Sequence, residues 1–194
     1  MYKNSVRSEQ LIKKATIELL SEKKSADKIT VSEIVEKAEI NRGTFYNHYK
    51  DIKDVLNQIE DEIMISFVKR WEWAGLGETT RFESFINELT NIFKEKEEVI
   101  KKIVQNVPSH IFDDLKMKVS EALVISPTFK DLSKEEWGFL SIISNGIAGM
   151  YLDYFSSRSS FSLEEIGQYA VSITRIVFYE RIKSANSACK KGER

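Results

Sequence analysis

The chain has 194 residues, of which 42% are hydrophobic and 30% are charged, and no apolar run reaches the roughly 18–20 residues that a membrane-spanning helix needs. Its single cysteine, Cys189, excludes a disulfide framework, and its N-terminus lacks the apolar stretch of a signal peptide, so we expect a soluble, cytoplasmic protein without a membrane partner. The formal net charge of −1 is unevenly distributed. Residues 1–50 contain ten Lys/Arg and seven Asp/Glu, whereas residues 51–194 contain nineteen Lys/Arg and twenty-three Asp/Glu. The basic balance of the N-terminal part favours nucleic acid as its partner.

Residues 5–22 form the first predicted helix. Lysines and glutamates occupy one of its sides, and the other side is an apolar face made of Leu11, Ile12, Ala15, Leu19 and Leu20. Together with two short helices further along the chain, this helix gives the minimum of three that buries a small core and holds one helix rigidly.

Residues 30–49, with the sequence TVSEIVEKAEINRGTFYNHY, are predicted to form two short helices joined by a tight turn. Thr30 is a good N-cap for the first helix, and Glu33 three positions later completes a capping box. The apolar stripe of that helix ends at Ala38, after which Asn41 can cap a second helix. The segment therefore has the pattern of a helix-turn-helix.

The second of these helices has one apolar edge and one polar surface. Phe45 and Tyr49 lie four positions apart, so both point to one side and belong to the core. The other positions are Arg42, Gly43, Thr44, Tyr46, Asn47 and His48. This polar surface suits the major groove of DNA. The same pattern occurs in helical domains that never meet nucleic acid, so the pattern alone leaves both interpretations open.

The run from Thr30 to Asp51 also resembles the N-terminal DNA-binding domain of the TetR/AcrR family of ligand-responsive transcriptional regulators. The matching residues are Thr30, Ile34-Val35, Ala38-Glu39, Asn41-Arg42, Thr44-Phe45-Tyr46 and His48-Tyr49. The resemblance implies an all-α fold, with a three-helix helix-turn-helix DNA-binding domain at residues 1–50 and a larger helical ligand-binding and dimerisation domain at residues 51–185. Residues 186–194 are expected to form a disordered tail.

The resemblance further implies which residues touch double-stranded DNA. Those expected at base edges are Ser32, Arg42, Gly43 and Tyr46, and those expected at phosphates are Thr30, Thr44, Asn47 and His48. Arg42 suits a bidentate pair with guanine, worth roughly 1–3 kcal/mol of discrimination, and Gly43, which has no side chain, would let the backbone approach closely. No metal or cofactor is predicted, because only His110 could join His48 as a ligand.

Two positions depart from the family pattern. Glu39 replaces the usual glycine of the turn, so we expect the turn to adopt a conformation that a non-glycine residue tolerates. Ile52 stands where the family usually has a lysine that reaches a phosphate, and Lys50 or Lys53 is expected to take over this contact. The residue at position 52 favours an alternative function, in which the protein acts mainly as a co-regulator through protein–protein contacts and has a weakened DNA-binding head.

Beyond Tyr49 all predicted elements are helices, and no strand pattern occurs. The predicted helices span residues 52–72, about 81–95, about 96–106, Ser109 to about Leu123, about 133–157 and about 162–184, with a glycine-containing break at 73–80 and a loop at 125–132. Ser133 and Ser162 each begin a predicted capping box.

The last two predicted helices are apolar on nearly every face, most clearly at residues 137–155. A helix of this kind must be buried on all sides, and pairing with a second copy of the chain in a four-helix interface explains the excess. The expected interface residues are Ile142, Gly146, Gly149, Tyr169, Ile173 and Ile176. The resemblance also implies a homodimer, and a monomer with a large core is the alternative.

The partner expected for the C-terminal part is a small-molecule effector whose identity the sequence does not give. Aromatic side chains are abundant in the middle helices, where they line either an apolar pocket or the core. The candidates for a pocket are Phe85, Phe112, Phe139 and Asn145. No catalytic constellation is present, so an enzyme is not predicted. We expect a dimeric, ligand-responsive repressor that binds a palindromic operator; activators are the less frequent type in such families.

Overall fold

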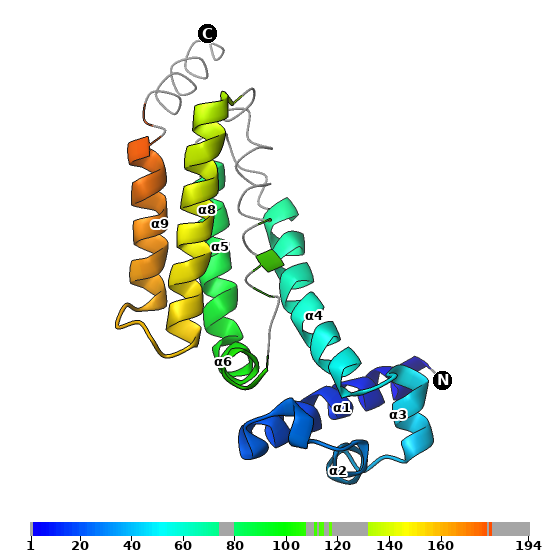
Figure 1. Ribbon diagram of the computed structural model, residues 1–194. Coiled ribbons are helices and arrows are strands. Elements are labelled where there is room, and N and C mark those ends of the chain that lie inside the picture. The colour runs from blue at the N-terminus through cyan, green and yellow to red at the C-terminus, as the bar shows by residue number, and fades with distance from the viewer. Residues whose placement is uncertain are drawn as a thin grey trace. The chain divides into compact units, whose positions relative to one another are not determined.

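The computed structural model describes residues 2–73, 80–107 and 132–177, together with single positions at 111, 113, 114, 117 and 179 (Figure 1). All regular structure in these ranges is helical, and no strand occurs in them. The elements are α1 (Tyr2–Lys23), the 3-10 turn η1 (Ala26–Lys28), α2 (Val31–Lys37), α3 (Arg42–His48), α4 (Ile52–Trp73), α5 (Thr80–Glu95), α6 (Glu97–Asn106), α8 (Lys134–Phe155) and α9 (Leu163–Val177). The predicted all-α fold class is confirmed.

The observed helices begin close to the predicted positions, and η1 is an addition that the sequence pattern did not predict. Among the described helices, none combines the length and the apolar character needed to cross a membrane. The helix predicted from Ser109 and the tail predicted at residues 186–194 fall almost entirely outside the described residues.

The chain forms two compact units. The first comprises Met1–Ile63 and Lys96–His110, and the second comprises Met64–Glu95 and Ile111–Arg194. Helix α6 therefore belongs with the N-terminal helices, where it packs against α1. The division into domains at 1–50 and 51–185 stays a prediction.

In the N-terminal unit α1 is the central helix and contacts η1, α2, α3 and α6. Leu11 is half-buried, and the other residues of the predicted apolar face of α1 are buried. The rest of this core consists largely of Ile29, Ile34, Ala38, Phe45, Tyr49, Val55, Leu56, Ile59, Ile100 and Ile103. Lys37 of α2 also pairs with Glu22 of α1 at 2.7 Å. The unit is thus a small platform that fixes α3 in place.

In the C-terminal unit α9 packs against both α5 and α8. Its core consists largely of Ile86, Leu89, Ile92, Phe93, Leu140, Ile143, Ile147, Ala148, Tyr151, Phe155, Leu163, Ile166 and Ala170. Both predicted capping boxes are confirmed. The Ser133 N–H donates to the Glu136 carboxylate at 2.8 Å, and the Glu136 N–H donates to Ser133 Oγ at 3.2 Å. The corresponding bonds between Ser162 and Glu165 are also 2.8 Å and 3.2 Å long.

A polar contact is buried inside the C-terminal unit. The hydroxyl oxygens of Thr90 and Tyr151 are 2.9 Å apart, and Thr90 also donates to the carbonyl oxygen of Ile86 at 2.7 Å, so Tyr151 is the donor to Thr90. Burial raises the pKa of the Tyr151 phenol to about 12. Gly167 lies directly beside this pair, because a Cβ at that position would be 2.8 Å from Thr90 Oγ1. Helix α9 can approach α5 this closely because residue 167 has no side chain.

Gly167→Ala is expected to destabilise the protein by about 1–2 kcal/mol, because the added methyl group would collide with Thr90. Gly138→Ala is the matched control. Gly138 also lies inside a helix, but beyond the backbone of that helix no described residue lies within 4 Å of an added Cβ. The better helix propensity of alanine should therefore stabilise the protein by up to about 1 kcal/mol. Urea unfolding followed by circular dichroism measures both changes. Equal effects of the two substitutions would contradict a tight contact at Gly167.

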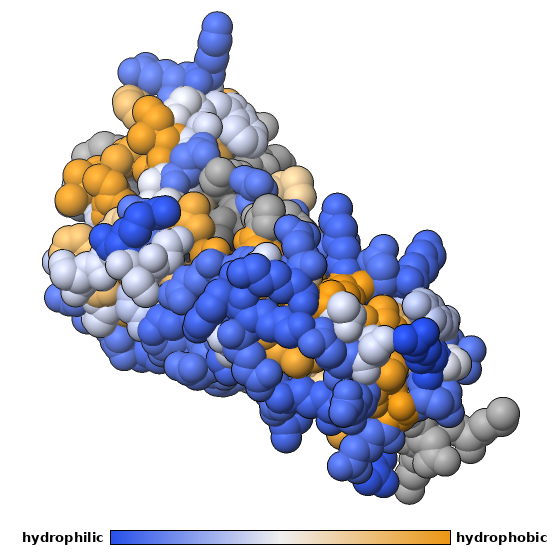
Figure 2. Space-filling model, turned by 60° about the horizontal axis from the view of Figure 1, so that its bottom comes forward, coloured by the Kyte–Doolittle hydropathy of each residue, from blue (hydrophilic) through white to orange (hydrophobic). Residues whose placement is uncertain are grey.

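Within one chain, α8 is buried on one face only. Leu140, Ile143 and Ile147 belong to the core, whereas Ile142 on the opposite side is 70% exposed. Helix α9 is similar, since Ile176 is 71% exposed. The large hydrophobic residues that are exposed on these two helices and next to α9 are Trp137, Phe139, Ile142, Phe161, Tyr169, Ile173, Ile176 and Tyr179. Figure 2 shows hydrophobic side chains gathered at the surface of this unit, at its upper left.

Candidate nucleic-acid interface

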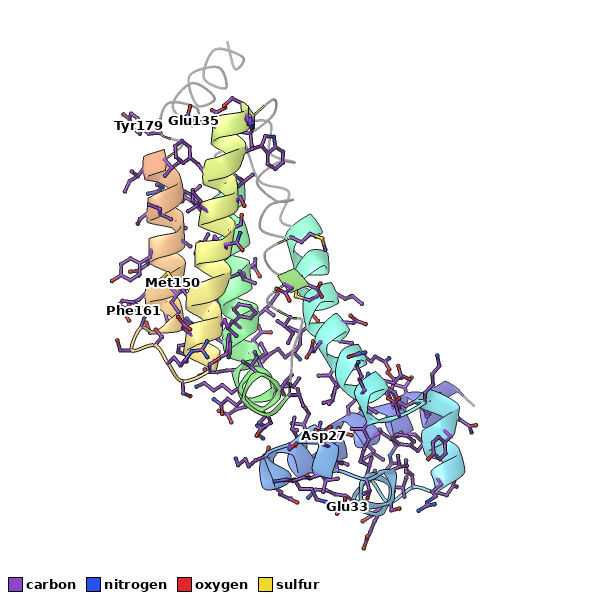
Figure 3. All side chains as sticks on the ribbon, in the orientation of Figure 1. Asp27, Glu33, Glu135, Met150, Phe161 and Tyr179 are labelled. Carbon is purple, nitrogen blue, oxygen red and sulfur yellow. The ribbon has the colours of Figure 1, made fainter. Side chains whose placement is uncertain are left out.

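Helix α2 begins at the capping box that the sequence predicts. The Glu33 N–H donates to Thr30 Oγ1 at 3.3 Å, and the Thr30 N–H donates to the Glu33 carboxylate at 3.0 Å. Lys23 of α1 donates to the same carboxylate, and the hydrogen bonds from Lys23 and Thr30 together lower the pKa of Glu33. The first turn of α2 is therefore fixed by its own cap and by α1 (Glu33 is labelled in Figure 3).

The turn between α2 and α3 contains a left-handed residue that is not glycine. Glu39 has a φ of 54°, a conformation that costs roughly 1–2 kcal/mol for an L-residue. Its N–H donates to the Glu36 carbonyl at 3.2 Å, and the Ile40 N–H donates to the Val35 carbonyl at 3.0 Å, which are the two bonds of a Schellman motif. We expected the turn to adopt a conformation that a non-glycine residue tolerates, and this expectation is wrong. The two hydrogen bonds keep the turn in the left-handed conformation that favours glycine, and Glu39 adopts it at an energetic cost.

Helix α3 places its residues as the helical pattern predicts. Phe45 is fully buried and Tyr49, the C-cap, is only 2% exposed, which confirms both as core residues. On the other side Arg42, Gly43, Tyr46 and Asn47 are exposed, and Thr44 and His48 are half-buried. Tyr46 is 59% exposed, and its ring packs edge-on against that of Phe45, with 5.4 Å between the ring centroids. The core thus positions Tyr46 while most of its surface stays accessible.

Asn41 caps α3, and its side chain explains a further role of the neighbouring glycine. Asn41 Oδ1 accepts from the Thr44 N–H at 2.8 Å and from the Thr44 hydroxyl at 3.1 Å. A Cβ at Gly43 would lie 3.2 Å from the same Oδ1, a tight fit that would press on the cap. The resemblance implied only a close approach of Gly43 to DNA, whereas the lack of a side chain at this position also leaves room for the Asn41 cap.

Two of the residues predicted at base edges are in contact with each other. Arg42 Nη2, at the start of α3, donates to Ser32 Oγ, in the first turn of α2. Both side chains are exposed. The spacing of ten residues gave no signal for this contact, because the contact depends on the angle at which the two helices cross.

The lysines that are expected to replace the missing phosphate contact lie just before α4 and in its first turn. Lys50 and Lys53 are both exposed, and Ile52, the first residue of α4, is half-buried. Two carboxylates share this turn. Asp51 accepts from the Asp54 N–H at 2.8 Å, and Asp54 accepts from the Lys50 N–H at 3.0 Å. These negative charges at the start of α4 offset part of the positive potential of the lysines.

The hydroxyl of Tyr49 is a buried polar group that has no hydrogen-bonding partner among the described residues. Burial raises the pKa of this phenol well above its usual value, and the nearby carboxylates of Glu9, Glu62 and Asp54 raise it further. A buried hydroxyl without a partner costs roughly 1–3 kcal/mol. Position 49 therefore carries an energetic cost that phenylalanine would avoid.

Tyr49→Phe is expected to stabilise the protein by about 1 kcal/mol, because it removes the hydroxyl and keeps the ring. Tyr151→Phe makes the same chemical change at a hydroxyl that has a partner, Thr90 at 2.9 Å, and should destabilise by about 1 kcal/mol. Free energies of unfolding in urea measure both. A loss of stability in Tyr49→Phe as large as that in Tyr151→Phe would show that the Tyr49 hydroxyl is satisfied.

The residues predicted for the ligand pocket are not brought together by the described part of the chain. Phe139 and Asn145 are exposed on α8, and Asn145 Nδ2 donates to the Ser141 carbonyl of its own helix at 2.8 Å. The side chains of Phe85 and Phe112 lie outside the described residues. The pocket stays a prediction. Among the residues described, no cluster of three or more His, Cys, Asp or Glu side chains is arranged to hold a metal ion.

The residues predicted for the dimer interface lie on the exposed side of α8 and α9. Ile142, Tyr169, Ile173 and Ile176 are between 43% and 71% exposed. Gly146 is exposed and Gly149 is half-buried. Apart from the backbone of their own helix, none of the described residues has an atom within 4 Å of a Cβ built on either glycine. Phe161 and Tyr179, which flank α9, point outward from its two ends (Figure 3).

Two sequence comparisons relate this geometry to known proteins. Residues 12–59, from α1 into α4, match the family described as bacterial regulatory proteins, tetR family. Over 51 residues the chain is 39% identical to the HTH-type transcriptional regulator YxbF of Bacillus subtilis (strain 168). That match covers 26% of this chain and only 13% of the length of the relative.

Solved structures are similar over most of the chain. A protein of Syntrophomonas wolfei str. Goettingen, assigned to the TetR family of transcriptional regulators, has a TM-score of 0.72 at 17% identity and covers 92% of this chain and 97% of its own. The dihydroxyacetone kinase operon activator DhaS has a TM-score of 0.63 at 17% identity, and the match covers 91% of this chain and 96% of DhaS. The TetR transcriptional regulator of Streptococcus agalactiae 2603V has a TM-score of 0.59 at 15% identity, and the match covers 88% of this chain and 95% of that protein. At these identities the likeness shows the fold.

Proposed function

We propose that this chain, whose N-terminal domain belongs to the TetR family of bacterial regulatory proteins, is a dimeric, cytoplasmic transcriptional regulator that binds a palindromic DNA operator and responds to a small molecule. The observation that carries the proposal is the exposed surface of α3, a polar helix face held rigidly on a buried core. DNA-binding transcriptional regulation is the activity of the family, and dimerism, the operator and the effector are our extension of it.

The exposed side chains of α3 have the chemistry that base recognition needs. Arg42 offers a planar set of donors for guanine, and Tyr46 and Asn47 offer further polar or stacking contacts next to it. We assign Arg42, Gly43 and Tyr46 to base edges, with Ser32 in contact with Arg42 beside them. We assign Thr30, Thr44, Asn47, His48, Lys50 and Lys53 to phosphates. In this arrangement α3 lies in the major groove, and the N-termini of α2 and α4 lie against the backbone.

The exposed apolar face of α8 and α9 supports a homodimer. Isoleucines that are about 70% exposed on two adjacent helices are costly in water, and a second copy of the same face would bury them. An interface of this kind has two-fold symmetry. Two α3 helices related by that symmetry would contact half-sites about one helical turn apart, or a multiple of it.

The C-terminal unit is the proposed site of the effector. A ligand that binds one arrangement of the dimer better than the other would shift the spacing of the two heads and so change operator affinity, a coupling of typically about 1–3 kcal/mol. Release from DNA by the ligand makes the protein a repressor. Activation of transcription is the other way in which such a regulator can act, and one protein of similar fold, DhaS, is described as an operon activator.

A co-regulator that acts through another protein is the second candidate function. The observation in its favour is the start of α4, where a half-buried isoleucine stands in the phosphate position and two carboxylates lie beside the lysines. A protein of this kind would keep the fold of the head and bind DNA weakly.

Selection from a randomised duplex library, followed by titration at several salt concentrations, tests the proposal. A regulator should enrich a palindromic duplex, bind it with a Kd in the nanomolar range or below, and lose affinity steeply as salt rises. Failure to enrich any sequence, with weak binding of all duplexes, would overturn the proposal in favour of the co-regulator.

A further inference from the structure

We propose that Ser32 is a positioning residue for Arg42. The Ser32 hydroxyl holds the Arg42 guanidinium at the N-terminus of α3 and so determines which base pair Arg42 recognises. This inference rests on the proposed function, because it concerns the same DNA-binding surface. It assigns Ser32 a role through Arg42, in place of a base contact of its own.

The contact joins two points whose backbones are both fixed. Ser32 lies in the first turn of α2, which the Thr30–Glu33 capping box closes. Arg42 is the first residue of α3, which Asn41 caps through the Thr44 N–H. Because Arg42 Nη2 donates to Ser32 Oγ between these two turns, the guanidinium is held relative to the backbone of both helices. A flexible side chain thus acquires a defined position before DNA arrives.

The hydrogen-bonding capacity of arginine allows both contacts at once. A guanidinium has five N–H donors, and a serine hydroxyl accepts one of them. Four donors remain, which is enough for the bidentate pair with guanine O6 and N7. Ser32 is exposed and short, so the DNA-facing edge of the guanidinium stays accessible. Holding a long side chain in its bound conformation improves affinity, because less freedom is lost on binding.

A double-mutant cycle on the duplex that the wild-type protein selects tests the inference. The proteins compared are the wild type, Ser32→Ala, Arg42→Ala and the double variant, each measured against that duplex and against duplexes with single base-pair changes. Ser32→Ala should weaken binding by about 3- to 10-fold and reduce discrimination at the base pair that Arg42→Ala identifies. In the Arg42→Ala background it should have no further effect. Ser32→Thr, which keeps a hydroxyl, should restore at least part of the affinity.

Two outcomes would overturn the inference and leave the proposed function intact. If Ser32→Ala weakens binding equally in both backgrounds, Ser32 contacts DNA by itself. If it changes neither affinity nor discrimination in the wild-type background, the hydrogen bond has no role in recognition. By contrast, failure of the wild-type protein to select any duplex overturns the proposed function, and the inference with it. Thermal melts of all variants verify that the heads remain folded.

Discussion

Ile142→Glu combined with Ile176→Glu is expected to convert a dimer into a monomer of 22.4 kDa and to weaken operator binding by about 100-fold or more. Both isoleucines are about 70% exposed within one chain, so the substitutions should change the stability of the monomer little. In the dimer they would place four carboxylates in an apolar interface, where unpaired charges are costly. Operator affinity falls because each head then binds its half-site alone.

Sedimentation equilibrium and titration with the selected duplex measure the two effects. Ile65→Glu is the matched control, because Ile65 is also exposed, at 48%, but lies on α4. It should leave both the mass and the affinity unchanged. A double variant that still sediments at twice the chain mass would show that α8 and α9 do not form the interface.

Arg42→Ala is expected to reduce discrimination at one base pair of each half-site by roughly 10-fold or more, in keeping with the 1–3 kcal/mol of a bidentate arginine–guanine pair. Because Arg42 is exposed, removal of its side chain should not disturb the core of the head. The measurement is the set of Kd values for the selected duplex and for its single base-pair variants. The loss should be concentrated at one position of the half-site.

Lys53→Ala is the matched control for charge. It also removes one exposed cation, but from the start of α4, where we place a phosphate contact. Binding should weaken equally on all duplexes. The slope of log K against log salt concentration should become shallower by about 1, because one counterion fewer is released. If Arg42→Ala and Lys53→Ala had the same uniform effect on selected and random DNA, the assignment of Arg42 to a base edge would be wrong.

The features that the sequence predicted correctly depend on residues close together in the chain. The capping boxes at Thr30, Ser133 and Ser162 each join residues three positions apart, and burial of Phe45 and Tyr49 follows from the period of a helix. Such contacts need only the local helical geometry. For the same reason the polar surface of α3 could be recognised before any packing was known.

The features that the sequence did not predict depend on how helices meet. The Ser32–Arg42 bond and the grouping of α6 with α1 join segments whose approach is set by tertiary packing. The left-handed conformation of Glu39 was not predicted either, because the two hydrogen bonds that close the turn outweigh the conformational preference of a non-glycine residue. The apolar composition of α8 also did not show which of its faces the chain itself covers.

The close approach at Gly167 limits how this region can vary over evolution. A larger residue at 167 is accommodated only if Thr90 becomes smaller, since Thr90 Oγ1 occupies the space. Loss of the Thr90 hydroxyl would leave the Tyr151 hydroxyl buried without its acceptor, a cost that phenylalanine at position 151 would remove. Positions 90, 151 and 167 are therefore expected to covary among related chains. One combination is threonine, tyrosine and glycine, and the other is a smaller residue at 90, phenylalanine at 151 and a larger residue at 167. Mixed combinations should be rare.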